Sequence, residues 1–396
     1  MQYNPLLPEV KDNPYPYYAY LRHHAPVYQV EGLGFRAISR YDDVDFILKN
    51  PKLFSSSILT TVLVGDLQPV PEALSLVASD PPEHMRLRKL VNKAFTPRII
   101  KSLGPRIREI AQDLLNQVAG HKEFDLVRDL SIPLPVIVIA EMLGVEPEQR
   151  ETFKRWSDDI IRATNRTYTA EEEQRIRQSI AEFRAYFQET IAARRTAPRE
   201  DLTTALVQAE EEKQALSASE VLSLLTLLLV AGNETTTNLI GNMMLALLEH
   251  PDQLAHVRVD PSLIPNAVEE TLRYDGPVQG LPRQATEDVK IAETLIPAGA
   301  LVFPLFASAN RDENKFPDPD RFDITRNTDG HLAFGFGIHY CLGAELARLE
   351  ARIAFEELFR RFPSLSHQDD TVTRVDSFFL RGLKTFPLVA NSTKGY

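Results

Sequence analysis

Hydrophobic and polar residues follow two different patterns along the chain, which predict helices in its middle and strands near its ends. Through residues 82–274, apolar residues recur at three- and four-residue spacing, the pattern of amphipathic helices. Near the N-terminus, two short apolar runs flank a glycine-containing turn, as in a hairpin. The pattern predicts helices at 99–118, 151–163, 170–195, 218–249, 261–274 and 342–361, and strands at 27–30, 34–38, 289–291, 301–307 and within 378–389.

These elements predict a protein that is mainly α, with a small β-containing lobe. The lobe draws on residues of about 1–80 and 278–307 and on the C-terminal tail, and the helical body covers about 82–274 and 342–361. Because the lobe is built from both ends of the chain, one cut cannot separate it from the body. We therefore expect residues 1–396 to form a single domain.

The helix predicted at 218–249 carries polar residues in an apolar setting. Ser217 and Glu220 match a capping box, and the run VLSLLTLLLV that follows is apolar nearly all round. The sequence AGNETTT then places glycine and three β-branched residues in mid-helix, where both are unfavourable. Glu234 and Thr235 form an acid–alcohol pair, and the Thr235 hydroxyl could bond back to a carbonyl. This pattern indicates a working site, and the alternative is a kinked packing helix with satisfied threonines.

Composition excludes several classes of function. The chain has 396 residues, 43% of them hydrophobic, and a net charge of -11, which argues against nonspecific binding to nucleic acid or an anionic membrane as its overall role. The N-terminus has no basic stretch followed by an apolar core, and the longest apolar run, near 221–231, is too short to cross a bilayer. We expect a cytoplasmic protein without a membrane anchor.

Cys341 is the only cysteine, so the chain can form neither an internal disulfide nor a multi-cysteine metal site. It lies in the sequence FGFGIHYCLG, directly before a predicted amphipathic helix. A helix N-terminus stabilises negative charge through its free N–H groups and its dipole, so this position suits a thiolate. Gly335, Gly337 and Gly343 allow a close backbone approach or left-handed torsions. The alternative is a cysteine that acts as a small buried hydrophobe.

Four motifs in order resemble those of the cytochrome P450 family, and the resemblance covers essentially the whole chain. They are AGNETT at 231–236, the E-x-x-R pattern at 270–273, FPDPDRF at 316–322 and the cysteine loop at 334–343. The resemblance implies the cytochrome P450 fold, in which a long central helix lies over haem b and one cysteine thiolate binds the iron.

The same resemblance assigns a role to individual residues. Cys341 would be the iron ligand, Thr235 would orient a water chain at the oxygen site, and Glu234 would link this chain to bulk protons. The other residues expected to bind the cofactor are His84, Arg88, Arg283, Phe334, Gly335, His339 and Gly343. The expected structural network consists of Glu270, Arg273 and Arg321. The expected substrate pocket is lined by Leu229, Val230, Asn233, Val278 and Phe379. The alternatives are ordinary solvated charges for His84, Arg88 and Arg283, and an exposed loop histidine for His339. For Glu270 and Arg273 the alternative is a surface ion pair.

The resemblance also implies an activity. It predicts a monooxygenase that inserts one oxygen atom from O2 into a C–H or C=C bond of a hydrophobic small molecule, such as a fatty acid, terpenoid, steroid or macrolide-like skeleton. Electrons would come from a ferredoxin and an NAD(P)H-dependent ferredoxin reductase. The alternatives are a peroxide-driven peroxygenase and a non-catalytic haem sensor or carrier, and the intact acid–alcohol pair argues against both.

A basic patch on this acidic chain could receive the electron donor. Residues 80–88 open a further predicted helix, and the patch consists of the basic residues Arg86, Lys89 and Lys93 near that start together with Arg98 and Lys101. An acidic ferredoxin would be steered to such a surface. An ordinary solvated helix face explains the same charges about as well.

Overall fold

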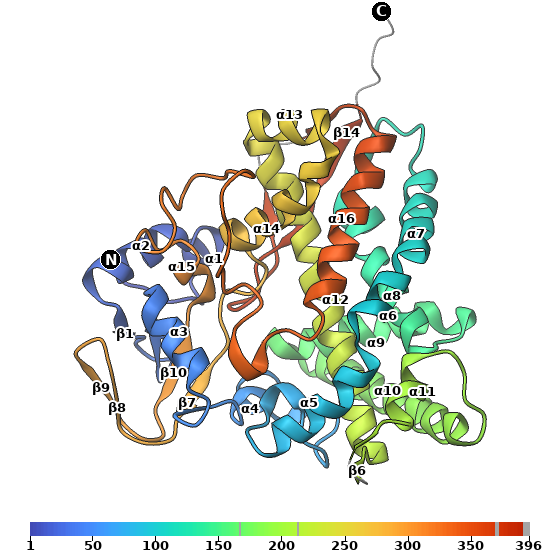
Figure 1. Cartoon of the computed structure of the whole chain (residues 1–396), viewed down its shortest axis with the longest axis horizontal. Helices are drawn as coiled ribbons and strands as arrows, with labels where there is room; N and C mark the ends of the chain where they lie inside the picture. Colours follow the sequence, from blue (N-terminus) through green and yellow to red (C-terminus); the bar gives the residue numbers. More distant parts are fainter. Residues whose placement is uncertain (166–167, 212–213, 369–371, 391–396) are drawn as a thin grey trace, which may run out of the picture.

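Strands from the two ends of the chain lie together on one side of the molecule, and helices fill the centre and the other side (Figure 1). The computed structural model describes residues 1–165, 168–211, 214–368 and 372–390. In Figure 1 the N-terminal segments (blue) and the strands near residue 300 (orange) form this shared lobe.

The helical body is organised around one long helix. Helix α12 (Ala218–Glu249) packs against α8 (Pro133–Leu143), α14 (Ile264–Asp275) and α16 (Ala344–Arg361). Most side chains of α12 are buried, which explains why its sequence is apolar nearly all round. The other α-helices are α1 (Pro8–Asp12), α2 (Tyr15–His24), α3 (Tyr41–Lys49), α4 (Leu59–Leu63), α5 (Glu83–Ala94), α6 (Pro97–Ser102), α7 (Gly104–Gln117), α9 (Arg150–Arg162), α10 (Ala170–Thr196), α11 (Leu202–Val207), α13 (Pro251–Val259) and α15 (Phe306–Ala309).

The lobe contains a five-stranded sheet in the order β1-β2-β10-β7-β3. Strands β1 and β2 form the predicted antiparallel hairpin, and β10 joins β2 in parallel from the far end of the sequence. The strands of this sheet are β1 (Val27–Gln29), β2 (Phe35–Ile38), β3 (Phe54–Ser55), β7 (Arg283–Ala285) and β10 (Leu301–Pro304). The pairing brings residues 27–55 and 283–304 into one sheet, and the division into a lobe and a body within a single domain stays a prediction.

The remaining strands form smaller sheets. A three-stranded sheet has the order β11-β14-β4, and three strand pairs join β12 to β13, β5 to β6 and β8 to β9. The bounds are β4 (Glu123–Asp125), β5 (Glu210–Glu211), β6 (Gln214–Ala215), β8 (Val289–Ile291), β9 (Thr294–Ile296), β11 (Leu365–His367), β12 (Thr373–Arg374), β13 (Leu383–Thr385) and β14 (Pro387–Ala390).

The C-terminal tail divides between the lobe and the helical body. Phe379 and Leu380 pack with the N-terminal Tyr3 and Val10 in the lobe. Strand β14, in contrast, pairs with β4 in the helical body. The tail therefore contacts both parts of the molecule, whereas the sequence predicted a place in the lobe for all of it.

Several helix limits agree with the sequence, and one predicted helix is broken. Helix α12 has the predicted bounds, and Ser217 and Glu220 form the capping box. The single helix predicted at 99–118 is wrong, because the structure has α6 and α7 instead. Pro105 lies in the first turn of α7. Proline is compatible with the first turn of a helix, but it disfavours a helix that continues through it from the preceding residues. Within the described residues, no helix is both long and apolar enough to cross a bilayer.

Candidate active site

The cysteine loop is a tight turn that ends at a helix N-terminus. Cys341 lies just before α16, and its backbone N–H donates to the carbonyl oxygen of Phe334 at 3.0 Å. Gly335 and Gly337 have φ angles of 69° and 70°, the left-handed region that favours glycine. Gly343 has an ordinary φ of -86°, so backbone torsion does not require glycine at this position.

The surroundings of the Cys341 thiol act on its charge in opposite directions. Burial raises its pKa, although the residue is accessible to solvent. The backbone N–H groups of Gly343 and Ala344, together with the guanidinium groups of Arg88 and Arg348, lower the pKa and oppose the effect of burial. This environment agrees with the predicted helix-terminus effect and suits a thiolate that is neutralised further by a bound cation.

Four basic side chains from three segments meet beside this loop. They are His84 and Arg88 on α5, Arg283 on β7, and His339 on a 3-10 turn (η7, Gly337–His339), and we call them the basic cluster. The rings of His84 and His339 have centroids 4.2 Å apart. Burial and then the charges of Arg283, His84 and Arg88 lower the pKa of His339 to about 3. Burial also lowers the pKa of Arg283 to about 10.

Among the described residues, the basic cluster has fewer carboxylates beside it than basic side chains within it. Asp80 is the carboxylate that acts on both His84 and Arg283. His84 is 1% exposed, and among the described residues neither of its ring nitrogens has a hydrogen-bond partner. The Nε2 atom of His339 lies 3.0 Å from the Ser56 hydroxyl. Buried polar atoms of native proteins are nearly always paired, so this cluster fits a ligand that carries carboxylates.

The acid–alcohol pair lies on α12 as predicted. The Thr235 hydroxyl donates to the carbonyl oxygen of Ala231 at 2.7 Å, the back-bond expected from the sequence. Burial is the larger cause that raises the pKa of Glu234 to about 7, and the negative charge of Asp158 on α9 is the smaller one. Glu234 is therefore a carboxyl group that can both hold and release a proton near neutral pH.

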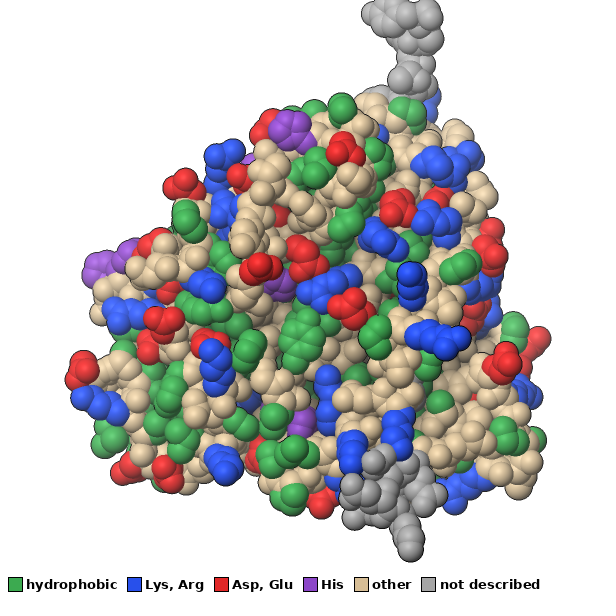
Figure 2. Space-filling view, in the orientation of Figure 1, with side chains coloured by type: hydrophobic (Ala, Val, Ile, Leu, Met, Phe, Trp, Pro, Cys, Tyr) green, Lys and Arg blue, Asp and Glu red, His purple; other side chains and the backbone are tan. Residues whose placement is uncertain are grey.

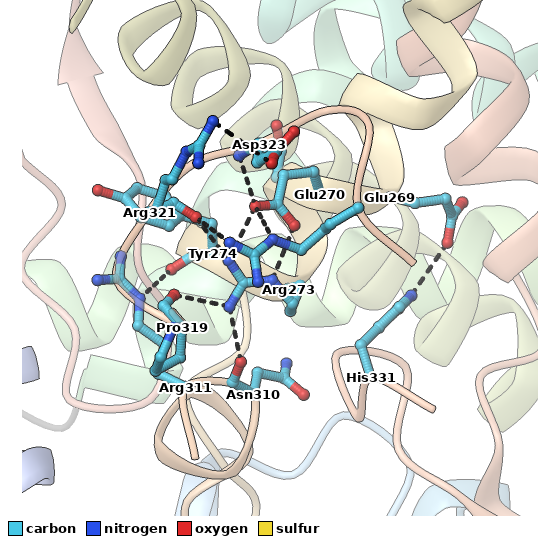
Figure 3. Close-up of polar contacts among 12 residues, drawn as sticks. Glu269, Glu270, Arg273, Tyr274, Asn310, Arg311, Pro319, Arg321, Asp323 and His331 are labelled. Atoms are coloured by element: carbon cyan, nitrogen blue, oxygen red, sulfur yellow. Dashed lines mark hydrogen bonds and ion pairs between the residues drawn. The ribbon is translucent and has the colours of Figure 1, made fainter. Parts of the chain in front are cut away.

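Glu270 and Arg273 form a completely buried ion pair on α14 (Figure 3). Arg273 donates from Nε and Nη2 to the two carboxylate oxygens at 2.7 and 2.8 Å. Its other N–H groups donate to the carbonyl oxygens of Asn310, Pro319 and Arg321. All five guanidinium donors are thus satisfied inside the protein, so the pair is not the surface ion pair that the sequence also allowed.

Arg321 joins this network through its backbone. Its side chain is 65% exposed and lies 3.7 Å from Asp323. The second cation at Glu270 is Arg326, with Nε 3.1 Å from Oε1. Sequence reasoning missed Arg326, because only the fold of the loop after residue 316 decides which arginine turns inward.

Glu269, the neighbour of Glu270 on α14, links this helix to the cysteine loop. Glu269 accepts from His331 at 3.0 Å and from Arg348 of α16 at 2.6 and 3.0 Å. Burial alone would raise the pKa of Glu269, but these two donors hold it at about 2. The Arg348 guanidinium lies 4.6 Å from the centroid of the Phe334 ring. Glu269 thus connects α14 to Phe334 through Arg348. These residues are far apart in sequence, so no local sequence pattern predicts the connection.

The predicted pocket residues fall into two groups. Val278 and Phe379 come together, because the backbone of Val278 bridges Leu380 and the N–H of Gln279 donates to the carbonyl oxygen of Phe379 at 2.8 Å. Val230 of α12 is half-buried.

The other two predicted pocket residues serve the packing of α12. Leu229 is completely buried in the hydrophobic core and so does not line an open surface. Asn233 is 4% exposed and donates to the Ser157 hydroxyl of α9 at 2.7 Å, which holds α9 on α12.

The arrangement fits a flat, apolar group that carries carboxylates. Ala231 is exposed in the middle of α12, most of which is buried. A Cβ atom built on Gly232 or on Gly343 would have no atom of the described chain within 4 Å apart from its own chain neighbours and the backbone of its own helix. A thiol at a helix N-terminus, glycine-lined backbone and the basic cluster match the iron, the ring and the propionates of haem, respectively.

The fold and this site define the haem-thiolate class of helical proteins, and comparison with known proteins gives the same result. The cytochrome P450 family model matches residues 5–261 and 258–387. Cytochrome P450 107B1 of Saccharopolyspora erythraea is 44% identical over 377 residues, which cover 91% of this chain and 90% of that protein.

Solved structures are equally similar. Cytochrome P450 CYP109Q5 from Chondromyces apiculatus has a TM-score of 0.93 and 46% identity, with 100% of this chain and 99% of that chain covered. CYP109E1 from Bacillus megaterium in complex with testosterone has a TM-score of 0.88 and 38% identity, with 96% and 100% covered. The chain belongs to the cytochrome P450 family. It is therefore an oxidoreductase of the monooxygenase type, and the family implies a haem-thiolate cofactor.

Proposed function

We propose that this protein binds haem b through Cys341 and inserts one atom of O2 into a C–H or C=C bond of a hydrophobic small molecule. The observation that carries the proposal is the position of the single cysteine at the N-terminus of α16, with N–H groups of Gly343 and Ala344 directed at its sulfur. The bound haem supplies the iron at which O2 is activated. The chain's own residues supply the ligand, the orientation and the protons.

Each part of the site has a distinct task. Cys341 donates electron density as a thiolate, and the N–H groups at the start of α16 keep that charge stable. The basic cluster holds the haem carboxylates and thereby fixes the orientation of the ring. Arg348 fixes Phe334 beside the thiolate, because Glu269 holds its guanidinium with two hydrogen bonds.

Glu234 and Thr235 deliver protons to the oxygen site. Glu234 takes a proton from solvent and releases it near neutral pH, since its pKa is about 7. The Thr235 hydroxyl, held by its bond to Ala231, accepts one hydrogen bond while it donates another, and so orients a water molecule next to it.

We expect Thr235→Ala to separate electron consumption from product formation. Without the hydroxyl, the water that carries the proton is no longer oriented, and reduced oxygen leaves as hydrogen peroxide. A lost positioned donor typically costs about 10²–10³-fold in the step it serves. The measurement is the ratio of product and peroxide to NAD(P)H consumed. Thr236→Ala is the matched control, because Thr236 is 2% exposed and interacts with Glu350 of α16. Unchanged coupling in Thr235→Ala would remove this residue from the proton path.

The proton path should also give a pH dependence. The pKa of Glu234 is raised to about 7, so the carboxyl holds its proton below that pH and loses it above. Product yield per electron should therefore fall as pH rises through about 7 in the native protein. In Glu234→Gln the yield should be low at all pH values and lose this dependence. An equal pH profile in both proteins would show that another group supplies the protons.

The substrate we propose is a hydrophobic skeleton such as a fatty acid, terpenoid, steroid or macrolide. The walls around Val278 and Phe379 are apolar, and an apolar pocket with few polar groups selects such molecules. The similarity to CYP109E1, which was solved with testosterone, supports the inclusion of steroids. A fatty chain or a steroid would therefore be the first compounds to test.

We further propose a ferredoxin and an NAD(P)H-dependent reductase as electron donors, in the cytoplasm. The basic patch supports this assignment, since Lys89, Lys93, Arg98 and Lys101 are exposed on α5 and α6. Figure 2 shows Lys and Arg side chains gathered over the face that carries α5, α6 and α16. Arg86 contributes less positive charge to this patch than the sequence predicted, because it forms ion pairs with Glu83 and Glu220.

Turnover with labelled oxygen tests the proposed function. The haem-loaded protein is supplied with a surrogate ferredoxin, its reductase, NAD(P)H and isotopically labelled O2, with testosterone and hexadecanoic acid as substrates. The proposal expects hydroxylated product that carries one labelled oxygen atom. Product that forms only with added peroxide, and without the label, would favour the peroxygenase alternative. Haem binding without any product from a wider set of hydrophobic compounds would favour a sensor or carrier.

A further inference from the structure

Asn242 lies two helical turns after Thr235 on α12, on the same face of the helix. It is completely buried, and its Nδ2 group donates to two carbonyl oxygens, that of Asp275 at 2.8 Å and that of Arg381 at 3.0 Å. Asp275 ends α14, and Arg381 follows the segment that contains Phe379. One side chain of the central helix therefore holds two chain segments that are far apart in sequence.

These two segments lead directly into the pocket walls. The N–H of Arg381 donates to the carbonyl oxygen of Pro277 at 2.8 Å, and the N–H of Gln279 donates to that of Phe379 at 2.8 Å. Residues 277–279 and 379–381 thus form one short antiparallel ladder, with Val278 opposite Leu380. Asn242 fixes the end of this ladder that is nearest to α12.

The contact between the ladder and α12 is close. A Cβ atom at Gly382 would collide with Oδ1 of Asn238, and one at Gly241 would lie 3.5 Å from the side chain of Leu383. The backbone at Gly382 therefore lies directly against the helix. Asn238 does not hold the ladder by hydrogen bonds, since among the described residues neither its Nδ2 nor its Oδ1 has a partner.

The ladder is anchored on its other side as well. The Arg381 side chain donates to the Asp275 carboxylate at 2.6 Å and to the carbonyl oxygens of Lys11 and Asp12 at 3.0 and 2.9 Å. Tyr15 also donates to Asp275. These bonds hold the ladder to the N-terminal segment, whereas Asn242, among the described residues, supplies the hydrogen bonds that tie it to α12 beside the packing at Gly382.

We propose that Asn242 is a positioning residue that sets the distance of the pocket walls around Val278 and Phe379 from the oxygen site at Thr235, and thereby selects which carbon of the substrate is oxidised. The inference rests on the proposed function, because it takes these walls as the substrate pocket. A rigid helix that carries both Thr235 and Asn242 couples the wall to the oxygen site through two helical turns. Neighbouring C–H bonds differ little in reactivity, so a small shift of the wall changes the ratio of products.

The test compares Asn242→Leu with Asn238→Ala. Asn242→Leu has similar volume and removes both N–H donors, whereas Asn238→Ala alters a buried asparagine one turn earlier that makes no hydrogen bond to the ladder. With hexadecanoic acid or testosterone as substrate, we expect Asn242→Leu to change the ratio of product isomers by about threefold or more. Asn238→Ala should leave the ratio within error of the native protein, and both variants should keep the thiolate-type spectrum.

A second measurement does not depend on turnover. Backbone hydrogen exchange in residues 276–281 and 378–383 should be faster in Asn242→Leu than in the native protein or in Asn238→Ala, because the ladder loses its hold on α12. Unchanged exchange in these segments, or an unchanged product ratio, would overturn the inference, and so would equal changes in both variants. If the native protein forms no product from any hydrophobic compound, the proposed function fails, while the exchange result still decides whether Asn242 holds the ladder.

Discussion

Cys341→Ala is expected to abolish oxygenation and the thiolate spectrum together. The chain has no other cysteine, so no second sulfur can replace the lost ligand. The reduced carbonyl complex of the native protein should show the red-shifted Soret band of a thiolate-bound haem, and the variant should lack it. Product formation should fall below detection, because electron donation from the thiolate is what favours cleavage of the O–O bond.

Cys341→Ser is the matched variant for this experiment. It keeps the size of the side chain and a polar atom at the start of α16, but it offers an alcohol in place of a thiolate. Circular dichroism should show that both variants fold, since Cys341 is accessible to solvent and each substitution adds no bulk. A red-shifted band in either variant would mean that another group binds the iron.

Arg273→Ala is expected to cost about 3–5 kcal/mol of folding stability, the usual loss when one partner of a buried ion pair is removed. Glu270 would be left inside the protein with Arg326 as its remaining cation. The carbonyl oxygens of Asn310, Pro319 and Arg321 would also lose their donor. The measurement is the free energy of unfolding in urea of the haem-loaded protein, together with the fraction of haem it retains.

Arg321→Ala provides the control for Arg273→Ala. The Arg321 side chain is 65% exposed, and its backbone carbonyl, which makes the contact with Arg273, survives the substitution. We expect a change within about 0.5 kcal/mol, as at most surface positions. If Arg321→Ala destabilised the protein as much as Arg273→Ala, the charge of Arg321 would matter in a way that this network does not explain.

The sequence allows the prediction of those parts of the fold that depend on local pattern. The bounds of α12 followed from its capping box and its apolar run, and the β1–β2 hairpin followed from two apolar runs around a turn. The position of Cys341 before α16 followed from the periodicity of the next twenty residues. The break between α6 and α7 was not predicted, because the apolar spacing continues across it. Pro105 was the signal in the sequence that indicated the break.

Contacts between distant segments could not be predicted in the same way. Strand β14 pairs with β4 in the helical body, and nothing in either short strand distinguishes this partner from the lobe. The choice of Arg326 over Arg321 as the inward-facing arginine depends on the path of the loop, not on residue type. The roles of Glu269, Arg348 and Asn242 could not be predicted either, because each contacts partners on elements that only the tertiary fold brings together.

The most direct test of the central claim is X-ray absorption at the iron edge of the haem-loaded native protein. Coordination of Cys341 to the haem iron predicts one sulfur atom in the first coordination shell of the iron, and the loss of that atom in Cys341→Ser. An iron shell that contains only nitrogen and oxygen in the native protein would contradict it.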